Sequence, residues 1–267
     1  MYWDQGWDSV KYSVKECAKS WQCYNPDWTV RLVDRFSVLN YIDVDELPRW
    51  CWDTPGPDGF WRRQRLWPRK FNAMIARSDF IRAFLVYKLG GVYVDCNTWC
   101  NSPLDEWVFD AISPVGFFSN YINPRGYKFE HQFYAGEPGN FILEKFWYNG
   151  IVPYWTRNGS AKIYRWAASV FDRIYRNNEE FKKEVDNVPR IQGVNKCNLV
   201  FRGFKHRRWP VTRPIPNNHG YVSRHIFGPV KFFKLGGGFY RGHIKSESTP
   251  WRRLQKKCAA ETSYTFD

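Results

Sequence analysis

Residues 78–107, SDFIRAFLVYKLGGVYVDCNTWCNSPLDEW, most constrain what this chain can fold into. They continue a stretch that begins near Arg69, in which apolar side chains recur at the three- and four-residue spacing of a helix. Gly90-Gly91 is a helix stop signal, because glycine adopts the left-handed conformation at little cost. Val92–Val94 is rich in β-branched and aromatic residues and predicts a short strand that ends at Asp95. A helix, a glycine stop and a buried strand in this order indicate an α/β fold.

Two polar residues follow the predicted strand and are candidates for binding a metal. On a strand, Asp95 and Asn97 point to the same side, and Cys96 points to the opposite side. Two oxygen donors at the C-terminal end of a strand suit a hard divalent cation, and such strand ends are where open α/β sheets bind ligands. The plain alternative is a strand-end turn in which Asp95 bonds the loop.

An arginine interrupts the apolar stripe of the predicted helix. Asp79 and Arg82 stand three residues apart and are therefore neighbours on the helix surface. One interpretation is a surface ion pair of small energy. An arginine on an apolar stripe requires a buried partner, however, which favours a functional site.

The polar residues of this segment form a known pattern, whose members are Ser78, Asp79, Arg82, Tyr87, Gly90, Gly91, Tyr93, Asp95, Pro103, Leu104 and Asp105. The pattern resembles that of the capsular polysaccharide synthesis and Och-type sugar transferases, family thirty-two of the glycosyltransferases. It is also similar to the glucosyltransferase domains of large clostridial toxins. Residues 3–34 and 133–147 extend the resemblance along the chain. Asn97 departs from it, because the family usually carries a second aspartate there, and an amide is a weaker, neutral ligand.

The resemblance implies a fold and a reaction. The expected fold is a single α/β domain over residues 1–267, a GT-A-like, Rossmann-related nucleotide-sugar-binding domain with a mixed central sheet flanked by helices. The expected reaction is the transfer of a sugar from a UDP- or GDP-sugar to a hydroxyl of a glycan or another acceptor, with retention of configuration and with Mn²⁺ or Mg²⁺.

The resemblance also assigns roles to residues. Asp79 and Arg82 are expected to contact hydroxyls of the donor sugar, and Asp95 and Asn97 to hold the metal. A basic segment near the C-terminus would add His243 as a metal ligand and Lys245 as a clamp on the diphosphate, with His219 and His225 as rivals for the histidine role. Glu130, His131 and Gln132 are expected near the anomeric carbon, where one of them orients the acceptor or stabilises the developing positive charge.

The net charge limits the classes of partner. Forty basic and 26 acidic residues give a formal charge of +14, spread along the chain. A basic protein binds a diphosphate donor, an anionic glycan, an anionic membrane surface or nucleic acid. No zinc-finger spacing or RNA-recognition motif is present, so we do not expect nucleic-acid binding. An alternative function is that of a carbohydrate-binding relative without catalysis, because Asn97 replaces the second aspartate of the family pattern.

The cysteines and the apolar runs bear on the compartment. The seven cysteines are irregularly spaced and include no CxxC pair, which favours free thiols in a reducing compartment. The sequence contains no signal peptide and no apolar run of transmembrane length. The expected location is cytoplasmic, with a lumenal fragment of an anchored enzyme as the alternative.

Periodicity and turn signals predict the remaining elements of the chain. Helices are expected over residues 9–21, with Asp8 or Ser9 as the N-cap, and over residues 139–154, 161–177 and 251–257. Strands are expected over residues 28–33, 112–118, 129–135 and 230–233.

Overall fold

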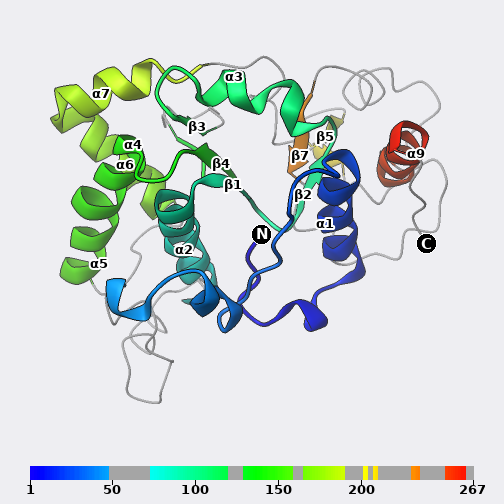
Figure 1. Cartoon of the computed structure of the whole chain (residues 1–267), viewed down its shortest axis with the longest axis horizontal. Helices are drawn as coiled ribbons and strands as arrows, with labels where there is room; N and C mark the ends of the chain where they lie inside the picture. Colours follow the sequence, from blue (N-terminus) through cyan, green and yellow to red (C-terminus); the bar gives the residue numbers. More distant parts are fainter. Residues whose placement is uncertain are drawn as a thin grey trace.

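The computed structural model of the chain describes residues 1–47, 73–119, 129–158, 165–189, 201–203, 207–209, 230–234 and 250–262. It is a mixed α/β structure in which helices surround small antiparallel sheets (Figure 1). The helices are α1 (Tyr12–Tyr24), α2 (Ala73–Leu89), α3 (Val108–Ile112), α4 (Phe141–Lys145), α5 (Val152–Asn158), α6 (Trp166–Asn177), α7 (Glu179–Asp186) and α9 (Pro250–Thr262). The strands are β1 (Gly91–Val94), β2 (Thr98–Cys100), β3 (Phe117–Ser119), β4 (Phe133–Gly136), β5 (Phe201–Gly203), β6 (Arg207–Trp209) and β7 (Phe232–Lys234).

A three-stranded sheet in the order β1-β4-β3 occupies the middle of the described structure. Both of its strand pairs are antiparallel, and β1 aligns Tyr93 with Tyr134 of β4. Two two-stranded sheets, β2-β7 and β5-β6, accompany it. The one parallel contact within the described residues is an isolated bridge between Tyr2 and Val33.

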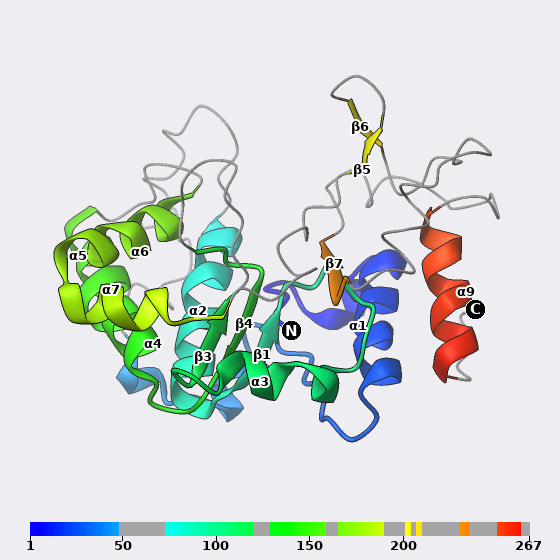
Figure 2. The same cartoon turned by 90° about the horizontal axis from the view of Figure 1, so that it is seen from above.

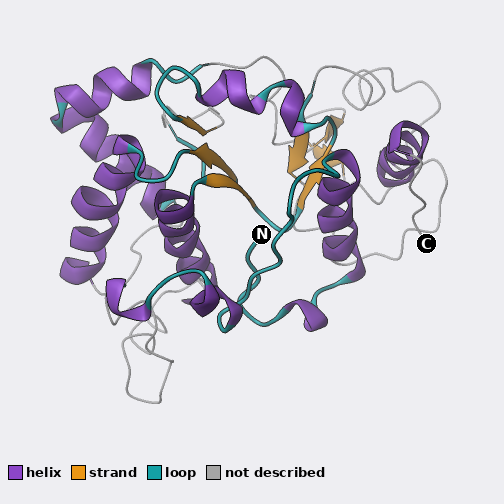
Figure 3. Ribbon diagram, viewed as in Figure 1, coloured by secondary structure: helices purple, strands orange, loops and turns teal. Residues whose placement is uncertain are grey.

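The central sheet is buried on both faces, because its side chains alternate between two apolar cores. Tyr93, Tyr134 and Phe117 belong to a core that also contains residues of α2, α4, α5 and α6. Phe133 and Phe118 point the other way, into a core with residues of α1, α3, β7 and α9. Figure 2 shows α2 and α4–α7 on one side of the sheet and α1 and α9 on the other, and Figure 3 shows the strands between them.

Helix α2 ends where the glycine signal predicts. Gly90 and Gly91 have φ angles of 69° and 86°, and the Gly90 amide donates to the Val86 carbonyl at 2.9 Å. A Cβ at Gly90 would lie 2.7 Å from Pro138, whereas a Cβ at Gly91 would meet nothing within 4 Å. The stop therefore also forms the surface on which the turn before α4 packs.

These two glycines provide a matched pair of substitutions. Gly91→Ala is expected to lower the free energy of unfolding by about 1–2 kcal/mol, the cost of left-handed backbone for alanine. Gly90→Ala adds the steric conflict with Pro138, so we expect about 2–4 kcal/mol. Urea denaturation of both variants measures the difference, and equal losses would contradict the close packing of Pro138 on Gly90.

Hydrophobic periodicity and turn signals predicted several helices and strands correctly and misplaced the bounds of others. The strand after Gly90, the helical segment from residue 141 to 158 and the terminal helix α9 are confirmed. The predicted strand over residues 112–118 is mostly wrong, because α3 extends to Ile112 and β3 begins only at Phe117. The predicted strand over 129–135 begins later, at Phe133, and α7 was not predicted.

The first predicted helix is confirmed with shifted bounds, whereas its predicted N-cap and the predicted strand over residues 28–33 are wrong. The first helix begins at Tyr12 rather than at Ser9, and Lys11 is its N-cap without a side-chain bond. The Ser9 hydroxyl instead donates to the Gly6 carbonyl at 2.8 Å, in a 3-10 turn before the helix. Residues 28–33 form only the bridge at Val33, and Leu32 is 41% exposed.

Two further findings concern the thiols and the membrane. Within the described residues Cys17, Cys23, Cys96, Cys100 and Cys258 are free thiols. None of the helices in the described ranges combines the length and the apolar character that crossing a membrane requires.

Candidate active site

Arg82 forms a buried ion cluster with two carboxylates. Its side chain comes from α2 and is only 6% exposed. The Nη1 atom lies 2.8 Å from Oδ1 of Asp95, and the Nη2 atom lies 3.2 Å from Oδ1 of Asp79. We call Asp79, Arg82 and Asp95 the Arg82 cluster. Two carboxylates and one guanidinium leave it with one net negative charge, which favours binding of a further cation.

Neutral groups complete the shell around the guanidinium. Its Nε donates to the Ser78 carbonyl at 2.9 Å, its Nη2 donates to the Ser78 hydroxyl at 2.8 Å, and its Nη1 donates to the His131 carbonyl. The ring of Tyr93 lies 5.0 Å from the guanidinium carbon. The planar fork of arginine is thus held from three elements, which fixes the positions of both carboxylates.

The electrostatic balance keeps Arg82 charged. Burial alone would lower its pKa, but the negative charges of Asp95 and Asp79 raise the pKa of Arg82 above its usual value. Burial raises the pKa of Tyr93 as well, so its phenol keeps its proton. That phenol lies 3.4 Å from Oδ1 of Asp95 and 3.5 Å from the Ser78 hydroxyl. The Arg82 cluster is therefore built around a charged guanidinium, with the neutral Tyr93 phenol beside it.

Asp95 lies in a tight turn rather than on the strand. The strand ends at Val94, and the Thr98 amide donates to the Asp95 carbonyl at 2.9 Å, which closes a turn that contains Asn97. The Asp95 amide donates to the Gln132 carbonyl at 2.9 Å, which ties this turn to the start of β4. The prediction placed Asp95 and Asn97 on the same side of a strand. The two residues instead lie together in one turn, so the argument from strand alternation does not apply to them.

The donor set of this turn suits a hard cation but is small. No group of three or more histidine, cysteine, aspartate or glutamate side chains that could hold a metal occurs within the described ranges. A carboxylate at Asp95 and an amide oxygen at Asn97 are oxygen donors of the kind that Mg²⁺ and Mn²⁺ prefer. Mg²⁺ sites commonly use one or two protein oxygens and take their other ligands from substrate phosphates and water. The turn fits a metal bound in this shared way.

Asp79 has a second partner from a distant helix. The Trp166 indole, at the start of α6, donates from Nε1 to Oδ2 of Asp79 at 3.1 Å. Trp166 is fully buried, with its ring edge-on to Trp155 at a centroid distance of 5.2 Å. Both oxygens of Asp79 are therefore held, one by Arg82 and the other by Trp166.

His131 lies beside the cluster as a neutral imidazole. Burial and then the charge of Arg82 lower the pKa of His131 well below its usual range. Its Nδ1 contacts the Tyr134 hydroxyl, and burial raises the pKa of Tyr134, so this phenol keeps its proton. The Nε2 atom of His131 is buried and has no hydrogen-bond partner within the described residues. A buried polar atom without a partner is suited to bind a polar group of a ligand.

Glu130 and Gln132 flank His131 and differ in whether their side chains have partners. The Glu130 carboxylate pairs with Arg165 at 2.8 Å, so its charge is compensated. The Gln132 side chain is buried, and its Nε2 has no hydrogen-bond acceptor in the described part of the chain. Of these two residues, Gln132 is the one with an unused donor.

Comparison with known proteins assigns the chain to a family. The family model described as "Capsular polysaccharide synthesis protein" matches residues 61–207, which is more than half of the chain and includes the whole Arg82 cluster. The chain belongs to the capsular polysaccharide synthesis protein family. This confirms the resemblance seen in the sequence.

A curated relative supports a transferase within this family. "Inositol phosphoceramide mannosyltransferase 3" of Schizosaccharomyces pombe (strain 972 / ATCC 24843) is 35% identical over 88 residues. That match covers 31% of this chain and 23% of the yeast protein, so the chain spans about a quarter of its length. No solved structure matched the chain.

The structure brings together most of the residues that the sequence predicted for this member of the capsular polysaccharide synthesis family. Asp79, Arg82 and Asp95 are in direct contact, and His131 joins them through its carbonyl. Asn97 shares the turn of Asp95, and Glu130 precedes His131. The predictions for Lys245, His243, His219 and His225 fall outside the described residues.

Sequence reasoning missed Trp166, Arg165 and Tyr134. Trp166 lies in the predicted helix over residues 161–177, and 87 positions separate it from Asp79. Arg165 immediately precedes it and pairs with Glu130, so the start of α6 serves two acidic site residues. A basic residue followed by a tryptophan at the start of a helix is a weak sequence signal for a functional site. Only the contacts in the folded structure show that these two residues belong to the site.

The Trp166 contact leads to a testable prediction. Trp166→Phe retains an aromatic ring but removes the N–H that holds Oδ2 of Asp79. Hydrogen bonds to charged groups contribute about 1.5–3 kcal/mol, so transferase turnover is expected to fall by roughly ten- to a hundredfold. Trp155→Phe is the matched control, because it shortens a neighbouring buried indole and leaves the Trp166–Asp79 bond in place. Equal turnover in the two variants would contradict a positioning role for Trp166.

Proposed function

We propose that this chain is a retaining, metal-dependent glycosyltransferase with a single GT-A-like domain. It would transfer a hexose from a UDP- or GDP-sugar to a hydroxyl of a glycan or another acceptor. The observation that carries the proposal is the Arg82 cluster, a buried and net-negative centre at the end of β1, inside the region that the family model matches. The mannosyltransferase name of the yeast relative supports the same class of reaction.

The metal and the diphosphate would meet at the turn after β1. Asp95 and Asn97 would hold Mn²⁺ or Mg²⁺, and the cation would neutralise the charge that develops on the leaving diphosphate. Lys245 and His243 remain our candidates for further contacts to the phosphates and to the metal. Arg82 holds Asp95 through Oδ1 and thereby fixes where the carboxylate stands before the donor binds.

The donor sugar would lie against Asp79. Arg82 and Trp166 each hold one carboxylate oxygen of Asp79, so the carboxylate is in place before the donor binds. Orientation of the sugar before reaction lowers the barrier by removing entropy that would otherwise be lost in the transition state. The contact of Arg82 with Oδ1 of Asp79 at 3.2 Å fixes the carboxylate in place, which suits hydrogen bonds to sugar hydroxyls.

The residues before β4 would act near the anomeric carbon. The Nε2 atoms of the neutral His131 and of Gln132 each lack a hydrogen-bond partner in the described part of the chain, and both suit contacts to a hydroxyl of the acceptor or of the donor sugar. Glu130 is compensated by Arg165, which weakens it as a covalent nucleophile. We therefore favour attack on the front face of the sugar, with retention, over a double displacement through Glu130.

The experiment that tests this function is a donor screen. Purified protein is incubated with UDP- and GDP-hexoses and Mn²⁺ or Mg²⁺, with neutral and anionic oligosaccharide acceptors, and released nucleotide is measured. We expect release from one nucleotide class, dependent on the cation and lost in Asp95→Asn. If no donor turns over under any of these conditions, while the protein still binds oligosaccharides, the chain is a carbohydrate-binding relative without catalysis.

A further inference from the structure

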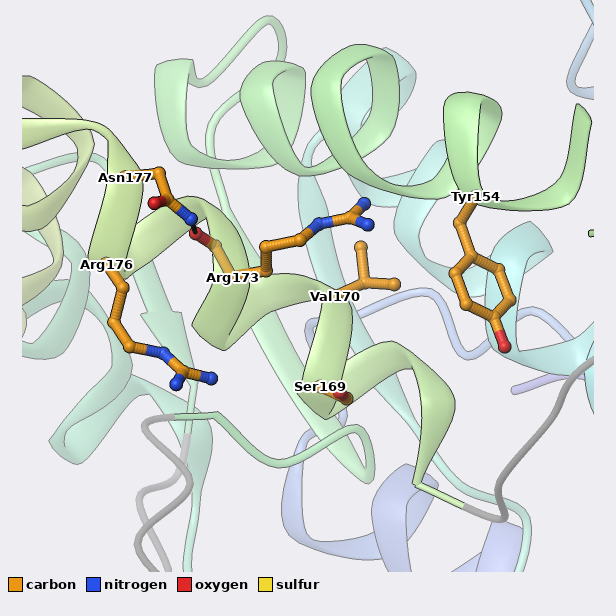
Figure 4. Close-up of a pocket in the computed structure, with 6 residues that line it drawn as sticks. All are labelled: Tyr154, Ser169, Val170, Arg173, Arg176 and Asn177. Carbon is orange, nitrogen blue, oxygen red and sulfur yellow. Dashed lines mark hydrogen bonds between the residues drawn. The ribbon is translucent and has the colours of Figure 1, made fainter. Parts of the chain in front are cut away.

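A basic groove lies on α6, beside the end of that helix that serves the Arg82 cluster. Its volume is about 330 Å³, and it is lined by Tyr154 of α5 and by Ser169, Val170, Arg173, Arg176 and Asn177 of α6. Figure 4 shows Tyr154 at one end, Arg176 and Asn177 at the other, and Arg173 between them. We call it the α6 groove.

The positive charge of the α6 groove has no counter-ion among the residues that the structure describes. Arg173 and Arg176 are exposed, and neither forms an ion pair within the described ranges. Arg176 donates from Nε to the carbonyl of Asp172 at 3.2 Å, not to its carboxylate. Guanidinium groups are suited to phosphate, because their N–H groups match its oxygens.

The other lining groups suit the sugar that carries such an anion. The hydroxyls of Tyr154 and Ser169 and the amide of Asn177 provide polar contacts, while Val170 contributes an apolar wall. The Asn177 amide is oriented by a bond from its Nδ2 to the Arg173 carbonyl at 2.6 Å, drawn as a dashed line in Figure 4. An aromatic ring, hydroxyls and guanidinium groups in one groove offer both apolar and polar contacts, as a ligand that joins a sugar ring to a phosphate requires.

The groove is connected to the Arg82 cluster through one aromatic pair. The Tyr154 ring stacks on Trp166 with a centroid distance of 5.3 Å and an interplanar angle of 23°. Trp166 in turn donates to Asp79. Ser169 lies about one helical turn after Trp166, so the groove begins next to the residue that we assign to the donor sugar.

We propose that the α6 groove binds a phosphate group carried by the sugar acceptor. The proposal rests on the proposed transferase function and adds the chemical class of the acceptor. Arg173 and Arg176 bind the phosphate oxygens, and the Tyr154 side of the groove receives the neighbouring sugar. The acceptor hydroxyl is thereby directed toward the side of the molecule where Trp166 holds Asp79.

Phosphate binding is tested without reference to catalysis. Inorganic phosphate is titrated by calorimetry into the wild type, into Arg173→Gln/Arg176→Gln, and into Lys15→Gln/Lys183→Gln, which removes the same charge from other exposed helix positions. We expect the dissociation constant to rise at least about tenfold in the arginine variant, from the loss of charge-assisted bonds, and to stay unchanged in the lysine variant. Equal affinity in all three proteins, or equal losses in both variants, would overturn the site.

The acceptor role is tested by kinetics with matched acceptors. Oligosaccharides with and without a phosphate group are compared at a saturating donor concentration. The arginine variant should raise the KM for the phosphorylated acceptor and leave the KM for the donor unchanged. Arginine-dependent phosphate binding without this change in acceptor KM would overturn the acceptor role. Absence of donor turnover in the wild type would instead contradict the transferase function, so the two failures are distinguishable.

Discussion

Replacing Arg82 with methionine is expected to lower the free energy of unfolding by about 3–5 kcal/mol, the usual cost of breaking a buried ion pair from one side. The side chains of Asp79 and Asp95 are only 14% and 17% exposed, so their charges would lose compensation where water cannot replace it. The Ser78 hydroxyl and the His131 carbonyl would lose a donor as well. Urea denaturation followed by circular dichroism measures the change.

The control for this prediction is an arginine outside the core. Arg157 is exposed in the last turn of α5, and Arg157→Met is expected to change stability by no more than about 0.5 kcal/mol. A double variant, Arg82→Met/Asp95→Asn, should recover part of the lost stability, because it removes one of the two uncompensated charges. If Arg82→Met costs no more than Arg157→Met, the Arg82 cluster as we describe it does not exist in solution.

Asp79→Asn is expected to lower kcat by about 10²- to 10³-fold, a typical loss when one oriented electrostatic group is removed from an active site. The amide has nearly the size of the carboxylate but lacks the charge that Arg82 and Trp166 orient. The KM for the donor should change less than kcat, because the contact matters most when positive charge develops on the sugar. Rates of nucleotide release at a saturating donor concentration measure this.

An aspartate remote from the site shows whether the loss is specific. Asp186 is exposed on α7 and accepts a bond from the Tyr175 hydroxyl at 2.7 Å. Asp186→Asn should retain turnover within about twofold, as expected for a surface substitution. A comparable fall in both variants would point to general destabilisation and away from a role for Asp79 in the reaction.

The sequence predicted the Arg82 cluster well because its members obey local rules. Asp79 and Arg82 are neighbours on one helix, and an arginine on an apolar stripe must find a buried partner. The structure confirms both expectations, and the buried partner of Arg82 is Asp95. The glycine stop reverses the chain after α2, and the short strand then brings Asp95 back to the helix. The fold of this region follows from the helix period, two glycines and a β-rich run.

The remaining parts depend on contacts that no local pattern contains. Residues 28–33 alternate like a strand, but a strand requires a partner, and only Val33 has one, in Tyr2. Strand alternation was used to place Asp95 and Asn97 on one side, but the strand ends at Val94, and the Thr98 amide bonds back to the Asp95 carbonyl in a turn. Trp166 donates to Asp79 only because the fold brings the start of α6 next to α2, and no local sequence pattern predicts that contact.

The central claim is that the turn at Asp95 binds the metal and the diphosphate of a nucleotide donor. The most direct measurement is calorimetric titration of UDP and of GDP, each with and without Mn²⁺, into the wild type and into Asp95→Asn, with Asp186→Asn as the control. We predict that one of the two nucleotides binds the wild type and the control only when Mn²⁺ is present, and that Asp95→Asn abolishes this binding. Nucleotide binding that is equal with and without the metal and unchanged in Asp95→Asn, or no binding of either nucleotide to the wild type, would contradict the claim.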